Sequence, residues 1–299
     1  MPHTHTPPQP DYNRSFAIGI SLNIIFVLIE LIYGTMAGSL ALIADAWHNL
    51  SDVLGLLLAW GANYLASRKA TEYRTYGFRR ATIIASLTSS IFLLLALGGI
   101  AWEALNRLLS PQEVNSTIII IVAAIGVVIN TATALLFIRG QKHDLNIRAA
   151  YLHMAADAGV SFGVVIAGIA IMLTNWLWLD PVISLFVVVI ILISTWDLFK
   201  DSINLSIDAV PKNIDITGIK NYLLNLDNVY AMHDLHVWAL STTEVALTVH
   251  IETSETLIDN NYLHNIQQHL KTHYKIDHAT IQIENNCSEN VCLLNKKRG

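Results

Sequence analysis

Residues 40–66 read LALIADAWHNLSDVLGLLLAWGANYLA, an apolar run that is interrupted by Asp45, His48 and Asp52. A transmembrane helix needs about 20 mostly apolar residues, so this run is long enough to form one. Burying a charged side chain in a bilayer costs about 2.5–3.5 kcal/mol on insertion scales, and such side chains usually have a function. The segment therefore predicts a membrane helix that carries a functional site.

The rest of the chain contains further segments of this kind. Apolar runs of membrane-spanning length lie at residues 16–33, 40–66, 83–102, 117–138, 149–173 and 176–196. Only 14% of the 299 residues are charged, whereas soluble domains carry about 25%. The net charge of −5 gives no reason to expect nucleic-acid binding. We expect a multi-pass protein of the lipid bilayer, with six helices, that does not bind nucleic acid.

Basic residues gather in two of the loops between these segments. The loop after the second segment holds Arg68, Lys69, Arg74, Arg79 and Arg80, and the one after the fourth holds Arg139, Lys142 and Arg148. The loops after the first and fifth segments have no Lys or Arg. Because basic loops stay in the cytoplasm, we expect both termini to be cytoplasmic. The membrane would be the cell membrane, or the inner membrane if the source is bacterial.

The last third of the chain predicts a small soluble α+β domain. Periodicity predicts a helix at 214–226, strands at 229–240 and 244–252, a helix at 256–274 and a strand at 279–284. This αββαβ order predicts a small sheet with helices on one face. We expect a flexible tail at 1–14, a membrane domain at 15–200, a cytosolic domain at 201–285 and a tail at 286–299. Two cysteines are too few for a disulfide framework.

The pattern His-x-x-x-Asp occurs in two of the predicted membrane helices, as His48/Asp52 and as His153/Asp157. Residues four apart share one face of a helix, so two such helices could offer two imidazoles and two carboxylates. Zinc accepts nitrogen and oxygen ligands in tetrahedral sites, whereas magnesium and calcium prefer oxygen alone. A hydrogen bond between helices could explain one such pair. The repetition of the pair favours a zinc site at membrane depth.

Two more carboxylates lie in the same helices. Asp45 comes one turn before His48, and Glu30 lies in the first predicted helix. Both are candidate proton relays, and Asp45 could instead orient the ring of His48. Structural pairing explains these two residues equally well.

A second group of candidate ligands lies in the soluble domain. Val245, Leu247, Val249 and Ile251 alternate, so His250 faces away from the core that they form. His278 and Glu284 share one face of the last strand, and His233 begins a neighbouring strand. The candidate ligands of this site are His233, His250, His278 and Glu284, with Cys287 and Cys292 close behind. Solvated surface histidines are the alternative explanation.

Several motifs together resemble a known family. They are ELIYG at 30–34, GSLALIADAWHNLSD at 38–52, YGFR at 76–79, HMAAD at 153–157, DP at 180–181, HDLHVW at 233–238 and HATIQIE at 278–284. With these motifs the chain resembles the cation diffusion facilitator family, and its zinc-type branch in particular. The resemblance covers nearly the whole chain.

The resemblance implies six membrane helices, a cytosolic domain of metallochaperone-like fold, a homodimer, and exchange of metal ions against protons. It implies a transport site at His48, Asp52, His153 and Asp157, and metal binding by the soluble cluster. Branches selective for manganese or iron have Asp or Asn in place of His48. The expected function is export of zinc, with cobalt and cadmium as further substrates, by alternating access.

Two other functions are compatible with a zinc site in a membrane. An intramembrane metalloenzyme would use zinc to activate water, but catalytic zinc keeps an open coordination position and a nearby general base. Four protein ligands close the coordination shell, so we expect no enzymatic activity. A metal sensor that transports nothing is the other alternative, and a flux measurement distinguishes it from a transporter.

Overall fold

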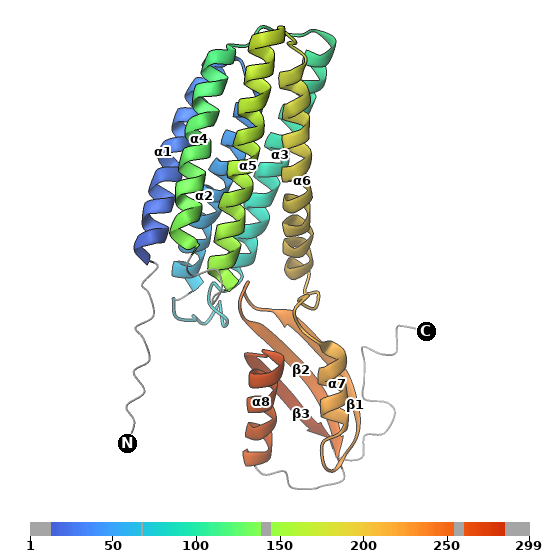
Figure 1. The fold of residues 1–299 in the computed structure, drawn as a ribbon. Coiled ribbons are helices and arrows are strands. Elements are labelled where there is room, and N and C mark those ends of the chain that lie inside the picture. Colours follow the sequence, from blue (N-terminus) through green and yellow to red (C-terminus); the bar gives the residue numbers. More distant parts are fainter. Residues whose placement is uncertain (1–12, 67, 139–144, 254–259, 285–299) are drawn as a thin grey trace, which may run out of the picture. The chain divides into compact units, whose positions relative to one another are not determined.

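The structure, a computed structural model, describes residues 13–66, 68–138, 145–253 and 260–284. The first six helices in it are α1 (Asn13–Ala37), α2 (Leu40–Ala66), α3 (Ala81–Leu109), α4 (Ser116–Phe137), α5 (Leu145–Thr174) and α6 (Leu179–Ser206). They are followed by α7 (Ile216–Leu224), β1 (Val229–Ala239), β2 (Val245–Thr253), α8 (Asn260–Tyr274) and β3 (His278–Glu284) (Figure 1). The chain folds into two compact units. The first unit comprises the chain up to Leu57 together with Ser89–Trp196. The second unit comprises Leu58–Thr88 and the chain from Asp197 onward.

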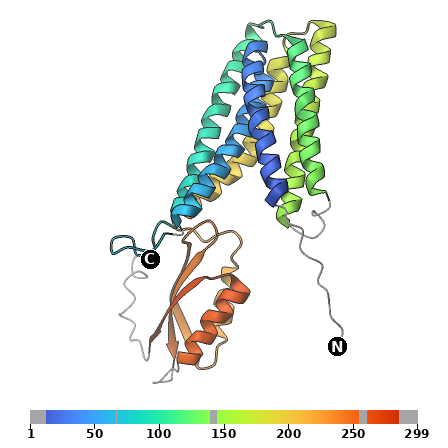
Figure 2. The ribbon, with the colours of Figure 1, turned by 90° about the vertical axis from the view of Figure 1, so that its left-hand side faces the viewer.

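In the first unit the long helices lie side by side, with α4 packed against α1 and α5 (Figures 1 and 2). Leu42, Ile119 and Val164 belong to one of its buried apolar clusters. Gly126 marks the point where α4 meets its two neighbours. A Cβ added at Gly126 would lie 2.6 Å from Phe26 Cζ and 3.0 Å from Ser161 Oγ. The absence of a side chain there lets α4 approach both α1 and α5.

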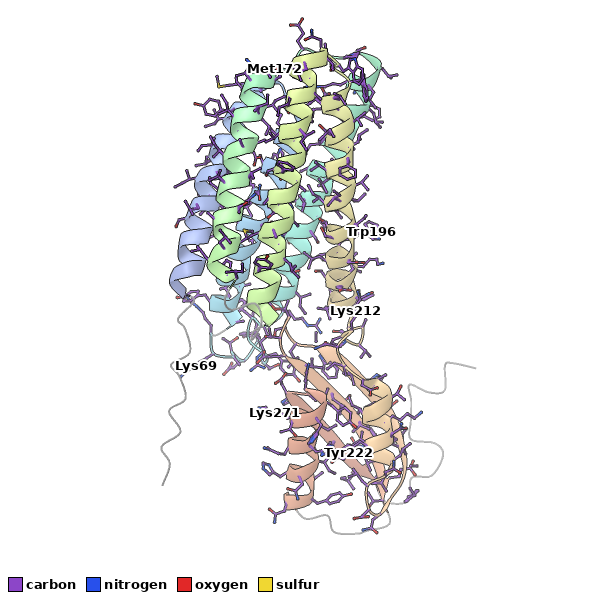
Figure 3. The ribbon with its side chains drawn as sticks, viewed as in Figure 1. Lys69, Met172, Trp196, Lys212, Tyr222 and Lys271 are labelled. Carbon is purple, nitrogen blue, oxygen red and sulfur yellow. The ribbon has the colours of Figure 1, made fainter. Side chains whose placement is uncertain are left out.

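Four of the described helical stretches are long and apolar enough to cross a membrane: Ala81–Leu109, Ser116–Phe137, Tyr151–Thr174 and Leu179–Ser206. Ser21–Ala37 is a shorter apolar stretch. Large apolar side chains such as Met172 and Trp196 project outward from the helices and are about half exposed (Figure 3). Apolar surface of this extent is unfavourable in water and suits contact with lipid. The predicted fold class, a helical membrane protein with a small α+β domain, is confirmed.

The sixth helix differs from the predicted segment at both ends. The apolar pattern predicted a span at 176–196, whereas α6 is Leu179–Ser206. Asn175 has a φ of 55°, so the chain turns before α6 begins. Helical hydrogen bonding continues beyond Trp196 to Ser206. The apolar pattern did not predict this extension, because hydropathy marks the part of a helix that contacts lipid and not the end of the helix. The domain boundary expected after residue 200 consequently falls inside α6.

The second unit contains a three-stranded sheet in the order β1-β2-β3. β1 and β2 are antiparallel, and β3 runs parallel to β2 after the crossover through α8. α7 and α8 cover one face of the sheet (Figure 2). Leu223 of α7, Leu247 of β2 and Leu270 of α8 are fully buried together in its core. The αββαβ order expected from the sequence is therefore confirmed.

The start of α2 is held by a carboxylate from α6. Ser39 Oγ donates to Asp180 Oδ1 at 2.5 Å, and the backbone N–H of Leu40 donates to Asp180 Oδ2 at 2.9 Å. Asp180 is almost fully buried. An anion beside the first N–H groups of a helix satisfies their hydrogen bonds and interacts favourably with the helix dipole. Asp180 therefore fixes the position of α2 relative to α6.

We expect Asp180→Ala to lower the thermal unfolding midpoint by several degrees. The substitution leaves two buried donors without an acceptor, which costs about 1–3 kcal/mol for each group. Unfolding of the full chain in detergent, followed by tryptophan fluorescence, measures the effect. The matched control is Asp197→Ala, because the Asp197 side chain is mostly exposed and lies 3.8 Å from Lys200. Equal midpoints for the two variants would contradict a stabilising role for Asp180.

Candidate metal centres

The two His-x-x-x-Asp pairs of the sequence meet in the first unit. α2 contributes His48 and Asp52, and α5 contributes His153 and Asp157. His48 Nε2 lies 3.5 Å from Asp157 Oδ1, and His153 Nε2 lies 2.9 Å from Asp52 Oδ2. Within each helix the imidazole nitrogen is 3.7 Å from the carboxylate one turn later. Each imidazole nitrogen thus lies close to both carboxylates.

These spacings suit a small tetrahedral ion. Zinc bonds of about 2.1 Å would place neighbouring ligand atoms about 3.4 Å apart. His48, His153 and Asp157 can offer ligand atoms that all lie within 4.8 Å of one another. Asp52 completes the group through its hydrogen bond to His153. The imidazole rings stand edge to face with their centroids 5.7 Å apart.

The four side chains are not equally accessible. The side chains of His48 and Asp157 are 15% and 5% exposed, whereas those of Asp52 and His153 are 37% and 42% exposed. Of the two ligands on α2, Asp52 lies nearer the C-terminal end of the helix. Of the two ligands on α5, His153 lies nearer the N-terminal end. An ion that reaches the accessible pair first would pass inward to the buried pair.

The candidate proton relays Asp45 and Glu30 are both buried near this centre. Ser161 of α5 donates to Asp45 Oδ2 at 3.3 Å, and Asn49 Nδ2 donates to Glu30 Oε2 at 3.4 Å. Among the described residues, Nδ1 of His48 has no hydrogen-bond partner. Asp45 was a candidate to orient the ring of His48, but no hydrogen bond joins these two side chains in the described part of the chain.

A second centre lies on the sheet of the second unit, on the face opposite the apolar core. His233 Nε2 is 3.1 Å from Glu284 Oε2, and His250 Nδ1 is 2.7 Å from Glu284 Oε1. The three residues come from β1, β2 and β3, and they can offer ligand atoms within 4.8 Å of one another. Gln282 Nε2 also donates to Glu284 Oε1, at 2.8 Å. Two imidazoles and a carboxylate are a suitable donor set for zinc.

The irregular pairing of β1 positions His233. His233 pairs directly with His250, but the register shifts between His233 and His236. Asp234 adopts a φ of 49°, which few residues other than glycine do. A bulge of this kind re-aims the neighbouring side chains. The bulge leaves His233 next to His250, whereas His236 is exposed.

The structure does not bring His278 to this centre. Strand alternation places His278 and Glu284 on one face of β3, but six residues of strand separate them by about 20 Å. His278 is paired with Ala246, and its ring lies against Tyr76 with the centroids 6.0 Å apart. The prediction of His278 as a ligand of this cluster is therefore corrected. Cys287 and Cys292 lie outside the described residues.

Glu252 is a residue of this centre that sequence reasoning missed. Its Oε1 lies 3.6 Å from His233 Nε2, and it pairs with Glu284 across β2 and β3. The signal was present in the sequence, because Glu252 follows His250 by two positions and so shares its face of the strand. With Glu252 the cluster has two imidazoles and two carboxylates, the same functional groups as the centre in the first unit, with glutamates in place of aspartates.

Both parts of the chain match known protein families. Residues 16–205 match the model of the cation efflux transmembrane domain, and residues 211–286 match that of the cation efflux protein, cytoplasmic domain. Three relatives are similar over nearly their whole length. The metal cation efflux system protein CzcD of Cupriavidus metallidurans is 35% identical, covering 94% of this chain and 89% of the relative. The zinc transporter ZitB of Yersinia pestis is 34% identical, covering 96% and 93%. A cadmium, cobalt and zinc/H(+)-K(+) antiporter of Bacillus velezensis is 33% identical, covering 95% and 92%.

We predict that Glu252→Gln weakens metal binding at the second centre by about tenfold or more, because it removes one anionic oxygen ligand. Calorimetric titration of the full chain with Zn²⁺ measures this in an Asp157→Ala background, which disables the first centre. Glu72→Gln is the matched control, since it makes the same change in the exposed loop between α2 and α3. Unchanged affinity in the Glu252 variant would exclude Glu252 as a ligand.

Proposed function

The chain belongs to the cation efflux family, also called the cation diffusion facilitators, and we propose that it exports zinc from the cytosol in exchange for protons. Its relatives carry the names of zinc transporters, metal efflux proteins and cation/proton antiporters. The observation that carries the proposal is the meeting of two imidazoles and two carboxylates between α2 and α5. Cobalt and cadmium are further candidate substrates.

The charge of the first centre suits a divalent ion. With both imidazoles neutral and both carboxylates ionised, the four ligands carry two negative charges. A bound dication makes the site neutral, which lowers the cost of holding an ion inside the membrane domain. Nitrogen ligands favour zinc over magnesium and calcium. We therefore assign His48, Asp52, His153 and Asp157 as the ligands of the transported ion.

Proton exchange follows from the same ligands. Metal binding needs neutral imidazoles and ionised carboxylates, so protons compete with the metal for one set of atoms. In an alternating-access cycle, zinc would bind from the cytosol through Asp52 and His153, and protons would displace it on the other side of the membrane. Asp45 and Glu30 lie buried next to the site and are candidates for passing those protons.

The second unit would regulate transport. We propose that the basic loops and both termini are cytoplasmic, that two copies of the chain associate through the C-terminal domain, and that His233, His250, Glu252 and Glu284 bind cytosolic zinc. A metal ion shared by three strands would hold the sheet in one arrangement. Family membership favours this transport cycle over the alternatives of a metalloenzyme and of a sensor without transport.

Uptake of zinc-65 into proteoliposomes with an imposed pH gradient tests the proposal. We expect Asp157→Ala to reduce uptake by more than tenfold, because a buried ligand is lost. Asp197→Ala, which makes the same change at an exposed position of α6, should retain the parental rate. Collapse of the pH gradient should also stop net accumulation in the parent. Equal uptake by both variants would mean that zinc crosses elsewhere, and uptake by none would reject transport.

We also predict that His48→Asp shifts ion preference from zinc towards manganese. The variant site has three carboxylates and one imidazole in place of two of each, and manganese prefers oxygen ligands more strongly than zinc does. The ratio of zinc to manganese uptake in the same vesicles measures the change, with the exposed His264→Asp on α8 as control. A ratio that stays at the parental value would show that His48 does not set selectivity.

A further inference from the structure

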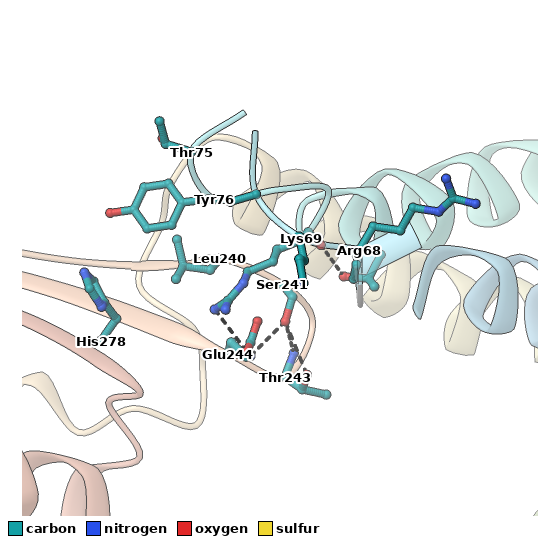
Figure 4. A pocket seen from close by; sticks show the side chains of 13 residues that line it. Arg68, Lys69, Thr75, Tyr76, Leu240, Ser241, Thr243, Glu244 and His278 are labelled. Carbon is teal, nitrogen blue, oxygen red and sulfur yellow. Dashed lines mark hydrogen bonds and ion pairs between the residues drawn. The ribbon is translucent and has the colours of Figure 1, made fainter. Parts of the chain in front are cut away.

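A cavity of about 680 Å³ lies in the second unit, and its lining includes none of the residues of the two metal centres. Its walls come from the loop between α2 and α3, the turn between β1 and β2, and the start of β3 (Figure 4). Lining residues that bear on its chemistry are Arg68, Lys69, Tyr76, Arg79, Glu244 and His278. A volume of this size is typical of pockets for small ligands.

The lining carries unbalanced positive charge. Glu244 is the acidic residue of the lining, and Arg79 Nη1 neutralises it at 3.0 Å. Arg68 lies over the ring of Tyr64 and donates to its hydroxyl group, and it extends away from Glu244 (Figure 4). Within the described residues, neither Arg68 nor Lys69 has a carboxylate partner. Without counting His278, the charged lining residues sum to two net positive charges.

The cavity also offers hydroxyl groups, from Thr75, Tyr76, Ser241 and Thr243. Cations combined with hydroxyl donors form the usual environment of a bound phosphate group. The walls are held together without that ligand, because Thr82 Oγ1 accepts from the N–H of Thr242 at 3.0 Å and Arg79 pairs with Glu244. A ligand would therefore enter a site that is already formed.

The position of the loop indicates where such a ligand comes from. Ala66 ends α2 and Ala81 begins α3, and both helices are assigned to the membrane domain. Tyr64, Tyr73 and Tyr76 around this loop are each about half exposed or more. Tyrosine is enriched where membrane helices meet the headgroup layer, and basic pockets at the cytoplasmic ends of membrane helices bind anionic headgroups.

We propose that this cavity binds the phosphate group of an anionic ligand, and that a phospholipid headgroup supplies it. Lys69 makes the main ionic contact, Arg68 contributes at the rim, and Arg79 stays paired with Glu244. Such a headgroup would bridge the membrane end of α2 and the turn between β1 and β2. This site is independent of the metal centres and of the transported ion.

Native mass spectrometry of the full chain in detergent tests this proposal. The probes are phosphatidylglycerol and phosphatidylcholine with identical acyl chains. We expect the parent to retain phosphatidylglycerol preferentially, and Lys69→Gln to weaken that binding by about fivefold, the effect of one interfacial cation. Arg68→Gln combined with Lys69→Gln should weaken it further. Phosphatidylcholine binding should not change. Size-exclusion chromatography and metal binding verify that each variant is folded.

Two matched controls separate a built site from general attraction to a basic surface. Arg74→Gln removes a charge from the same loop but outside the lining, and Lys271→Gln removes one from α8. Both should retain parental binding. A loss in Arg74→Gln as large as that in Lys69→Gln, or no loss in Lys69→Gln, would overturn the proposal. If an equal concentration of glycerol 3-phosphate displaced the lipid, the bound phosphate group would belong to a soluble ligand and not to a phospholipid headgroup.

Discussion

Ionised side chains within membrane helices must be neutralised, and the arrangement of the first unit depends on this requirement. His48, Asp52, His153 and Asp157 cost several kcal/mol if they stand alone in lipid. They are tolerable because each imidazole lies next to carboxylates of both α2 and α5. Contacts around them position these helices: α4 approaches α1 and α5 at Gly126, Asp180 of α6 holds the start of α2, and Ser161 of α5 donates to Asp45 of α2. In the proposed transport cycle an ion or its competing protons would satisfy the same four groups, which would couple the two fluxes.

Local periodicity was sufficient to predict the helices and strands and which polar side chains share one face of an element. A separation of four residues places His48 beside Asp52 and His153 beside Asp157 in any α-helix, whatever the tertiary structure. Alternation in β2 likewise predicted that His250 faces away from the core. These predictions depend on geometry within one element, which the sequence specifies directly. The pairing of α2 with α5 needed one further premise, that repeated polar units inside a membrane meet.

Features that depend on register between elements were not predictable in this way. His278 shares the face of Glu284, yet it lies at the opposite end of β3, and only the pairing with β2 shows which ligands are level with Glu284. The bulge at Asp234 sets the direction of the His233 side chain, and no local sequence pattern predicts this bulge. The carboxylate of Asp180 binds the start of α2, a contact between two helices that no pattern within either helix predicts. Glu252 was predictable as a ligand, because it shares the face of His250 in β2, but it was not among the predicted ligands.

X-ray absorption at the zinc edge tests most directly whether the ion is held by these four side chains. The chain with His233→Ala and His250→Ala, loaded with one equivalent of Zn²⁺, isolates the membrane centre. We expect four nitrogen or oxygen neighbours at about 2.0–2.2 Å with the scattering pattern of two imidazoles. That pattern should be lost when Asp157→Ala is added. A shell of six oxygens, sulfur at about 2.3 Å, or an unchanged spectrum in the Asp157 variant would contradict it.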